Sequence, residues 1–444
     1  MSSSPLPLAA RLTPDGKFYG WTVAWGACAI TFVTSGIGFY GQAVLLKPLR
    51  KAHHWSNGSV SGAIGLYYLI AGIVGILIGR RIDRLGIKRL IYMGTAIMTV
   101  AIIAVGYAHT LPILYLDFAV WAVGFGLGGG LVVSAMITRW FVLQRGQALS
   151  IALTGVSVGG LIFSPLTTKI IATSGLRTAT LVLAIVVIAV AWPVATFVLA
   201  DWPADYGLLP DGAVALDDHT DRLPSDRAVE NVLLSATAQQ RIWTRREASG
   251  TRAFWLVMVT ATVLLTSQTG FLLHQVSFLT DRFSSAQTAS LTLSAVAVAS
   301  IISRAIIGQF VDAMSKRYLM AALMMMQAIA IFTVIHVENR IVTFVCVGVV
   351  GLTIGTIFMS QQLIIGEIFG MVSFPVIFGM VGMANNLGSA IGPTLVGWAD
   401  DHTGSYVLPF TIGAIVTVGC AIAIAFARPP RGARAELADV ARSR

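Results

Sequence analysis

Arg304 is the residue with the clearest capacity for specific chemistry, because it carries a charge inside an apolar stretch that runs from 288 to 310. An arginine near the centre of a membrane helix costs about 2.5–3.5 kcal/mol on insertion scales, so its charge needs a partner. Its planar guanidinium matches a carboxylate with two parallel hydrogen bonds. Few acids within apolar stretches could pair with it instead, Asp117 and Glu367 being the candidates. We therefore predict that Arg304 binds the carboxylate of an organic anion; a structural ion pair is the alternative.

His274 lies in another apolar stretch, 253–279, and is a candidate for binding the anion or for moving a proton with it. Imidazole titrates near neutral pH, which suits both roles. Helical rise places His274 about 12 Å from the level of Arg304, a gap that a long arginine and a small acid can just bridge. A hydrogen bond from the imidazole to a backbone carbonyl is the alternative. Asp117 is a second candidate for proton coupling.

Three further side chains are predicted to line the same binding site. Tyr40 and Trp121 could form aromatic walls of a small cavity, and Asn385 could supply a polar contact from another apolar stretch. Each has an ordinary structural alternative. Aromatic rings commonly pack between helices, and amide side chains commonly hydrogen-bond across helices for about 1 kcal/mol each.

These residues must be positioned by helices that cross a membrane. Apolar residues make up 56% of the 444 and charged residues only 11%, against roughly 25% charged in soluble domains. A spanning helix needs about 20 apolar residues. Twelve stretches qualify, or eleven if the weak 317–336 stretch fails to span: 18–45, 58–79, 90–108, 112–137, 146–172, 178–200, 253–279, 288–310, 317–336, 340–366, 375–399 and 405–427. The predicted fold is therefore an all-α membrane protein with twelve transmembrane helices.

The distribution of Lys and Arg predicts the orientation of these helices. Outside the long 201–252 loop, the loops on the side of both termini contain 16 basic residues and the opposite loops contain 7. Basic loops stay in the cytoplasm, so both termini are predicted to be cytoplasmic. The net charge of +10 then reports topology, and no nucleic-acid partner is expected. The first 17 residues lack the apolar core of a cleavable signal peptide.

The chain reads as two related halves. An offset of 229 residues takes Gly79 to Gly308 and Asp83 to Asp312. Paired membrane halves are typical of carriers that rock around a central site. The predicted divisions are a six-helix bundle at 1–200, a cytoplasmic linker at 201–252, a pseudo-symmetric six-helix bundle at 253–427 and a cytoplasmic tail at 428–444.

The charged loops at the ends of the repeated stretches are predicted to form a gate. A carboxylate there can accept hydrogen bonds at a neighbouring helix N-terminus or pair with a basic residue, and so hold the halves in one state. Inside-positive anchoring is the alternative, although it does not explain the spacing of Gly and Asp. The predicted gate residues are Gly79, Asp83, Arg84, Gly86, Lys88, Arg89, Asp312 and Arg317.

Enzymatic and sensor functions find no support in the sequence. No HExxH, CxxC or Walker motif is present, and the seven histidines are scattered. A sensor would usually add a soluble domain of roughly 100 residues or more, and the longest loop has about 50. We therefore predict a transporter that is not an enzyme and that needs no cofactor and no metal. Its predicted partners are a small organic anion, membrane lipid and, if it works as a symporter, a proton.

Several motifs resemble known families. GRRIDRLGIKR (79–89) resembles the signature of the major facilitator superfamily. PDGKFYGW (14–21) and the segment 139–160 are similar to motifs of monocarboxylate carriers, and DYGLLPDG (205–212) is similar to bacterial members. SRAIIGQFVD (303–312) is similar to the substrate-arginine region of that family and of oxalate/formate exchangers. The resemblance implies the major facilitator fold, alternating access, Arg304 as substrate-binding residue and a bacterial inner membrane.

The chain departs from the mammalian monocarboxylate carriers at two positions that the resemblance associates with proton coupling. Ser300 occupies the place of an aspartate one turn before Arg304, and Tyr40 occupies the place of a lysine. Symport of a monocarboxylate with a proton, and exchange of one anion for another, therefore both stay open. Efflux of a drug or metabolite is a further alternative, although a cationic drug would be repelled by Arg304.

Overall fold

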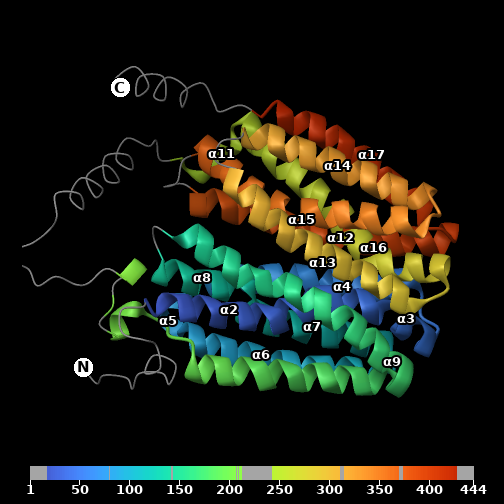
Figure 1. Ribbon diagram of the computed structural model, residues 1–444, viewed down its shortest axis with the longest axis horizontal. Helices are drawn as coiled ribbons and strands as arrows, with labels where there is room; N and C mark the ends of the chain where they lie inside the picture. The colour runs from blue at the N-terminus through green and yellow to red at the C-terminus, as the bar shows by residue number, and fades with distance from the viewer. Residues whose placement is uncertain are drawn as a thin grey trace, which may run out of the picture.

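A computed structural model describes residues 18–79, 81–141, 144–206, 208, 210–212, 243–310, 315–369 and 374–427 (Figure 1). Within these ranges a few side chains, among them that of Asp83, also lie outside the description. All regular elements of the described residues are helices, and none is a strand. The predicted all-α fold is therefore confirmed.

The first half contains six helical passes. They are α2 (Gly20–Ser35) with the π-helical turn η1 (Gly36–Gly41) and α3 (Gln42–His53), then α4 (Asn57–Gly79), α6 (Ile87–Val105), α7 (Leu111–Gly128) with α8 (Gly130–Trp140), and α9 (Arg145–Phe197), which folds back at Gly175. Gly175 has φ 83°, a left-handed conformation that glycine adopts without steric cost. The short α5 (Ile82–Leu85) lies between α4 and α6, and 3₁₀ turns cover Pro203–Tyr206 and Pro210–Gly212.

The second half contains six further passes and one short helix. The passes are α12 (Arg252–Phe283), α13 (Ala286–Phe310), α14 (Lys316–His336), α15 (Arg340–Phe369), α16 (Phe374–Thr403) and α17 (Val407–Ala425). The short helix, α11 (Arg245–Ser249), precedes α12 and is capped by reciprocal hydrogen bonds between Thr244 and Glu247. Residues 213–242 of the predicted linker and the tail 428–444 lie outside the described residues.

The helices are long and apolar enough to cross a membrane. Ten segments of the described chain meet both criteria, and one of them, Gly146–Phe197, contains the two passes joined at Gly175. Lys316–His336, the weak stretch that favoured a count of eleven, is among the ten, whereas α16 (Phe374–Thr403) is not. Large apolar side chains such as Val100, Ile185 and Ile415 are more than 60% exposed, as expected where helices face lipid.

The helices form two bundles that lie one above the other in Figure 1, the blue-to-green passes of the first half below and the yellow-to-red passes of the second half above. Within the first bundle α2 packs on α9 and α6 on α7, and within the second α13 packs on α15 and α14 on α17. The predicted boundaries at 200 and 253 fall between these two sets of helices, and as domain limits they stay a prediction.

The halves meet mainly where α4 packs on α16, α9 on α13 and α3 on α12. The far end of the molecule is defined here by the turns at 54–56, 284–285 and 404–406, and the near end by the turns that precede α6, α9 and α14. The contact of α4 with α16 runs from Gly58, beside Asp401, to Gly72, where an added Cβ would lie 2.9 Å from the Asn386 Cβ. Beyond it, an added Cβ at Gly79, Gly379 or Gly382 would meet nothing within 4 Å. The two helices therefore touch at the far end and separate toward the near end.

Glycine allows α2 and α9 to approach backbone to backbone. A Cβ added at Gly159 would lie 2.5 Å from the Gly36 Cα and from the Phe32 carbonyl oxygen, and neither backbone atom can move without shifting its helix. This packing holds the start of η1, which carries Tyr40, against α9.

Gly159→Val is expected to destabilise the protein by about 1–3 kcal/mol or more, because the new side chain would overpack a backbone contact. The measurement is the thermal unfolding midpoint of the detergent-purified protein. Gly348→Val is the matched control, since an added Cβ at Gly348 meets nothing within 4 Å. Equal midpoints for the two variants would contradict the packing argument.

Candidate functional site

Arg304 links the two halves near the centre of the molecule. Its Nη2 donates to the Ser300 hydroxyl at 2.7 Å and to the Ser157 hydroxyl, and its Nη1 donates to the Leu153 carbonyl at 3.4 Å. Its Nε donates to the Ser300 carbonyl at 3.2 Å. Ser300 lies on α13 with Arg304, whereas Ser157 and Leu153 belong to α9 of the other half. The arginine therefore spans the interface between the bundles.

The Arg304 side chain extends toward mid-membrane. Side chains of an α-helix tilt toward its N-terminus, and the N-terminus of α13 is at the far end. Its partner Ser157 lies 12 residues after the start of α9, which is about 18 Å from the near end at 1.5 Å per residue. The apolar core of a bilayer is about 30 Å thick. The guanidinium thus reaches deeper than its Cα, instead of snorkelling to the nearer surface.

No carboxylate pairs with Arg304 among the described residues. The two ion pairs found there, Lys47 with Asp281 and Arg50 with Asp400, both lie at the far end. Among the described residues, neutral hydroxyl and carbonyl groups therefore accept all the hydrogen bonds of this partly buried cation. A carboxylate would accept stronger, charge-assisted bonds from the same fork. The geometry is suited to binding an anion at Ser157 and Ser300.

Tyr40 lies beside this arginine. It belongs to η1, and its ring occupies the space next to Gly160, where an added Cβ would come within 2.6 Å of Tyr40 Cδ2. Tyr40 also interacts electrostatically with Arg304. A π-helical turn inside an α-helix often marks a functional site, and here it directs Tyr40 toward the arginine. Of the predicted binding residues, Tyr40 is thus the one that the structure brings to Arg304.

Trp121 belongs to an aromatic cluster made of Phe39, Tyr40, Tyr67, Tyr68, Trp121 and Phe125. Neighbouring ring centroids in it lie 5.2–6.3 Å apart. The Tyr67 hydroxyl and the Trp121 Nε1 are buried and have no hydrogen-bond partner among the described residues. The cluster extends from Tyr40, beside Arg304, into the first bundle.

Asn385 is engaged within the second bundle. Its Nδ2 donates to the Gln361 Oε1 at 3.1 Å, and the Gln361 Nε2 lies 3.5 Å from the Asn385 Oδ1. The two amides therefore satisfy each other between α15 and α16. Among the described residues, no hydrogen bond joins Asn385 to Arg304, and its role in binding stays a prediction.

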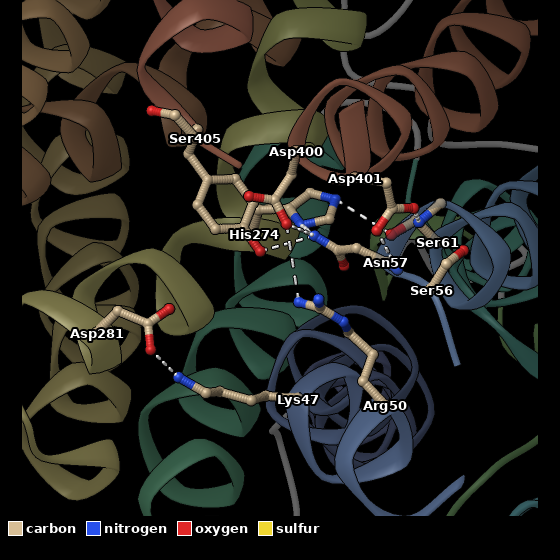
Figure 2. A network of polar contacts seen from close by, with 12 residues as sticks. Lys47, Arg50, Ser56, Asn57, Ser61, His274, Asp281, Asp400, Asp401 and Ser405 are labelled. Carbon is tan, nitrogen blue, oxygen red and sulfur yellow. Dashed lines mark hydrogen bonds and ion pairs between the residues drawn. The ribbon is translucent and has the colours of Figure 1, made fainter. Parts of the chain in front are cut away.

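His274 lies in a polar network at the far end, shown in Figure 2. Its Nε2 lies 3.0 Å from the Pro393 carbonyl and 3.2 Å from the Ser61 hydroxyl, and its Nδ1 lies 3.5 Å from the Asn57 Nδ2. A carbonyl can only accept, so Nε2 carries the hydrogen of that bond. His274 and Arg304 share no hydrogen-bond partner among the described residues. The structure thus places His274 between the halves rather than beside the arginine.

Asn57 and Asp401 join the two halves in the same network. The Asp401 carboxylate accepts from the backbone N–H of Asn57 at 2.7 Å and of Gly58 at 2.5 Å. These amides begin α4, and an anion there is stabilised by the helix dipole and by otherwise unpaired N–H groups. The N-terminus of a helix in one half is therefore capped by a carboxylate from the other half. We call this contact the Asp401 cap.

Further contacts surround the Asp401 cap. The Asn57 Nδ2 donates to the Asp400 carboxylate at 2.9 Å and to the Tyr406 hydroxyl at 2.7 Å. Burial, reinforced by the Asp400 charge, raises the pKa of Tyr406, which keeps this phenol neutral. The Arg50 Nη1 lies 3.9 Å from Asp400, and Lys47 pairs with Asp281 (Figure 2). All these bonds cross from the first half to the second, so they close the far end.

Asp117 occupies the buried face of α7, one turn before Trp121. Its side chain is 8% exposed, and its Oδ2 has no hydrogen-bond partner among the described residues. A buried carboxyl without partners favours its neutral form, so the position suits a group that gains and loses a proton. Among the described residues, no hydrogen bond or ion pair joins Asp117 to Arg304 or to His274.

The predicted gate residues lie at the near end, toward which α4 and α16 separate. Gly86 has φ 78° and forms the turn before α6, whose Lys88 N–H donates to the Asp201 carboxylate at 2.9 Å. Arg84 and Arg89 are exposed, and Arg317 stacks on Tyr318. Asp312 and the side chain of Asp83 lie outside the described residues. The gate therefore stays a prediction.

Sequence reasoning missed the residues that close the far end and the hydroxyl partners of Arg304. Asn57 at the start of a helix and the Asp400–Asp401 pair at the end of another were the available signals. These residues indicate the ends of two helices. They do not indicate that Asp401, at the end of one helix, caps the helix that begins at Asn57. Ser157 and Ser300 gave no signal beyond their polarity. No group of His, Cys, Asp or Glu in the described chain is arranged to hold a metal ion.

Two helical bundles that are closed at one end and meet around Arg304 are an arrangement typical of membrane transporters. Residues 28–282 and 253–442 match the family model of the Major Facilitator Superfamily. The chain belongs to that superfamily. A solved structure of similar fold is a bacterial homologue of the human lysosomal transporter Spinster, in an inward-facing and unoccupied conformation. It has a TM-score of 0.63 and 14% identity, covering 93% of this chain and 96% of that one, and this shows a shared fold.

Similar proteins of known sequence include three transporters. They are the uncharacterized MFS-type transporter YcxA of Bacillus subtilis (23% identity), the Fujikurins efflux protein of Gibberella fujikuroi (30%) and the riboflavin transporter MCH5 of Saccharomyces cerevisiae (27%). The matched segments cover 39%, 40% and 34% of this chain. They span 43%, 39% and 29% of those relatives, so less than half of each is compared. These similarities support transport in general and do not confirm a monocarboxylate as substrate.

Asp401→Asn is expected to shift the protein toward states that are open at the far end. The amide keeps the shape of the carboxylate but loses its charge at the N-terminus of α4, at a cost of about 1–2 kcal/mol. Such a loss changes the ratio of closed to open states roughly five- to thirtyfold. Lys51 and Gln287 are exposed residues of opposite halves. Distances between spin labels at these two positions, measured by double electron-electron resonance, would report the shift.

The matched control is Glu338→Gln, which makes the same charge change at an exposed far-end residue. It should leave the distance distribution of the wild type unchanged. The role of the Asp401 cap is contradicted if Asp401→Asn also leaves that distribution unchanged.

Proposed function

We propose that this protein is a secondary carrier of small organic anions, of the monocarboxylate class, and that Arg304 binds the carboxylate of the substrate. The observation that carries the proposal is the set of partners around the guanidinium. Among the described residues, only hydroxyl and carbonyl oxygens accept its bonds, and no carboxylate neutralises it. A cation in this position is costly unless an anion joins it.

Movement of the substrate would follow from the asymmetry between the two ends. In this conformation the Asp401 cap closes the far end, and α4 and α16 separate toward the near end. Rocking of the halves around Arg304 would break the far-end network and bring the near-end charges together. We propose that Asp83 and the basic residues of its loop then form the opposite closure, with Asp312 and Arg317 in the corresponding loop of the second half.

The coupling mode has two versions. In symport, Asp117 or His274 would take up the proton that accompanies the anion. Asp117 suits this role through its unpartnered oxygen, and His274 through its place in the network that must break when the far end opens. In exchange, a second anion would return on Arg304, and no proton site would be needed. The pH dependence of transport would also reflect the other charged groups of the far-end network that contains His274. They are Lys47, Arg50, Asp281, Asp400 and Asp401.

Efflux of a larger metabolite is the second candidate. It is favoured by the similarity to proteins named for the efflux of fujikurins and the transport of riboflavin, and by the aromatic cluster next to Tyr40. For either candidate we propose that both termini face the cytoplasm, because basic residues gather on their side, and that the membrane is a bacterial inner membrane.

Counterflow in proteoliposomes tests the proposed function. Vesicles loaded with lactate, pyruvate, formate, oxalate or benzoate should accumulate the same labelled acid transiently, with and without a proton gradient. Arg304→Ala should lose this uptake, and Arg304→Lys should bind roughly thirtyfold or more weakly, because about 2 kcal/mol of charge-assisted bonding is lost.

Arg177→Ala is the control, because Arg177 is an exposed far-end arginine, and it should transport normally. Wild-type counterflow in Arg304→Ala would contradict the carboxylate assignment. A gradient that stimulates uptake would favour symport, and uptake that requires a counter-anion would favour exchange.

Asp83→Asn is expected to change the rate of transport more than the affinity for substrate. The substitution keeps the shape of the side chain and removes its charge, so the state closed at the near end should lose population while binding within each state stays similar. Transport rates in both directions and equilibrium binding are the measurements. Asp205→Asn, at an exposed residue of a 3₁₀ turn, is the control. Unchanged rates in both directions would show that Asp83 has no gating role.

A further inference from the structure

The aromatic cluster contains two polar groups that the first bundle leaves unsatisfied. Tyr67 and Trp121 are both fully buried, at 0% exposure, and their rings are 5.8 Å apart. Neither the Tyr67 hydroxyl nor the Trp121 Nε1 has a hydrogen-bond partner among the described residues. Buried polar groups are nearly always hydrogen-bonded, so two unsatisfied groups in contacting rings point to a bound partner.

The cluster is continuous with the arginine site. Gly38 and Tyr40 lie two residues apart in η1, within one helical turn. The Tyr67 hydroxyl lies against Gly38, 2.8 Å from the position of an added Cβ, and the Tyr40 ring lies against Gly160, one turn after Ser157. The same short segment thus contacts both the buried hydroxyl of the cluster and α9, whose Ser157 accepts a hydrogen bond from Arg304.

We propose that Tyr67 and Trp121 form a second subsite, which binds a hydrogen-bond acceptor at the end of an aromatic body whose carboxylate binds Arg304; this deepens the proposed function and rests on it. An indole N–H only donates, and a phenol donates or accepts, so the complementary group is a phenolic or carbonyl oxygen. The surrounding rings of Phe39, Tyr68 and Phe125 favour a flat unsaturated body by edge and offset contacts. The substrate class is an aromatic carboxylate with a polar oxygen opposite its acid group.

Paired ligands test the subsite in the full-length purified protein. 4-Hydroxyphenylacetate and phenylacetate differ by one hydroxyl, and acetate lacks the ring. In the wild type, phenylacetate should bind more tightly than acetate. The hydroxylated acid should bind more tightly than phenylacetate by roughly two- to tenfold, the effect of one net hydrogen bond. Affinities are measured by calorimetry at constant pH.

Tyr67→Phe and Trp121→Phe should each reduce the preference for the hydroxylated acid, Tyr67→Phe to about one. A thermal unfolding midpoint close to that of the wild type shows that the variants are folded. Tyr115→Phe is the matched control: Tyr115 lies on the same helix as Trp121, but its hydroxyl lies near Gly62 and outside the cluster, so the preference should persist.

The outcomes separate the subsite from the proposed function. Arg304→Lys should weaken both aromatic acids equally and leave their ratio unchanged. If the wild type binds the two aromatic acids equally, or if the preference survives in Tyr67→Phe, water alone satisfies the two groups and the subsite is wrong. If carboxylate binding does not depend on Arg304, the proposed function fails whatever the ratio.

Discussion

A cation between the two halves, with no carboxylate of the described residues paired to it, is the constraint on which the rest of this structure depends. An arginine keeps its charge at physiological pH, and the hydrogen bonds of Arg304 to described residues all go to hydroxyl and carbonyl oxygens. The hydroxyl groups of Ser157 and Ser300 accept hydrogen bonds from the guanidinium, and bonds to neutral acceptors are weaker than bonds to a carboxylate. A fully paired arginine would be satisfied and inert, whereas this one retains a large free-energy gain for an incoming carboxylate. In the proposed function, this partial satisfaction is what would make the position a binding site.

The same arginine is also a mechanical element, because its partners come from both halves. Bonds to Ser157 and Leu153 tie α13 to α9 at the level where the substrate would bind. A ligand that competes for the guanidinium must therefore act on the interface between the bundles. At the far end, the Asp401 cap holds that interface through backbone amides, whose bonds are lost once the helices separate. A ligand can shift such an equilibrium only by binding one state more tightly than the other.

Local patterns were sufficient to predict the fold. Apolar length, basic loops and the repeat relating Gly79 to Gly308 indicated the helices and their pairing into halves. They also predicted that Arg304 lies inside the membrane, because a charged residue within an apolar stretch can be recognised from the sequence alone. They did not show that its side chain reaches toward the centre, which depends on helix direction and on where α9 offers hydroxyl groups.

Contacts between distant spans were beyond sequence reasoning. His274 was expected to be near the substrate, and its actual neighbours, Ser61 and Pro393, come from spans more than 100 residues away. The Asp401 cap joins residues 344 positions apart. The π-helical turn that directs Tyr40 reflects packing of Gly36 on Gly159, a contact that a glycine-rich sequence permits without specifying.

The most direct measurement is an experimental structure of the protein with a bound carboxylate such as phenylacetate. The account predicts both carboxylate oxygens within hydrogen-bond distance of the Arg304 Nη atoms, with the Ser157 and Ser300 hydroxyls moved from their present bonds or shared with the ligand. A ligand bound elsewhere, with Arg304 still donating to both serines as it does here, would contradict it and would make this arginine a structural link between the two halves.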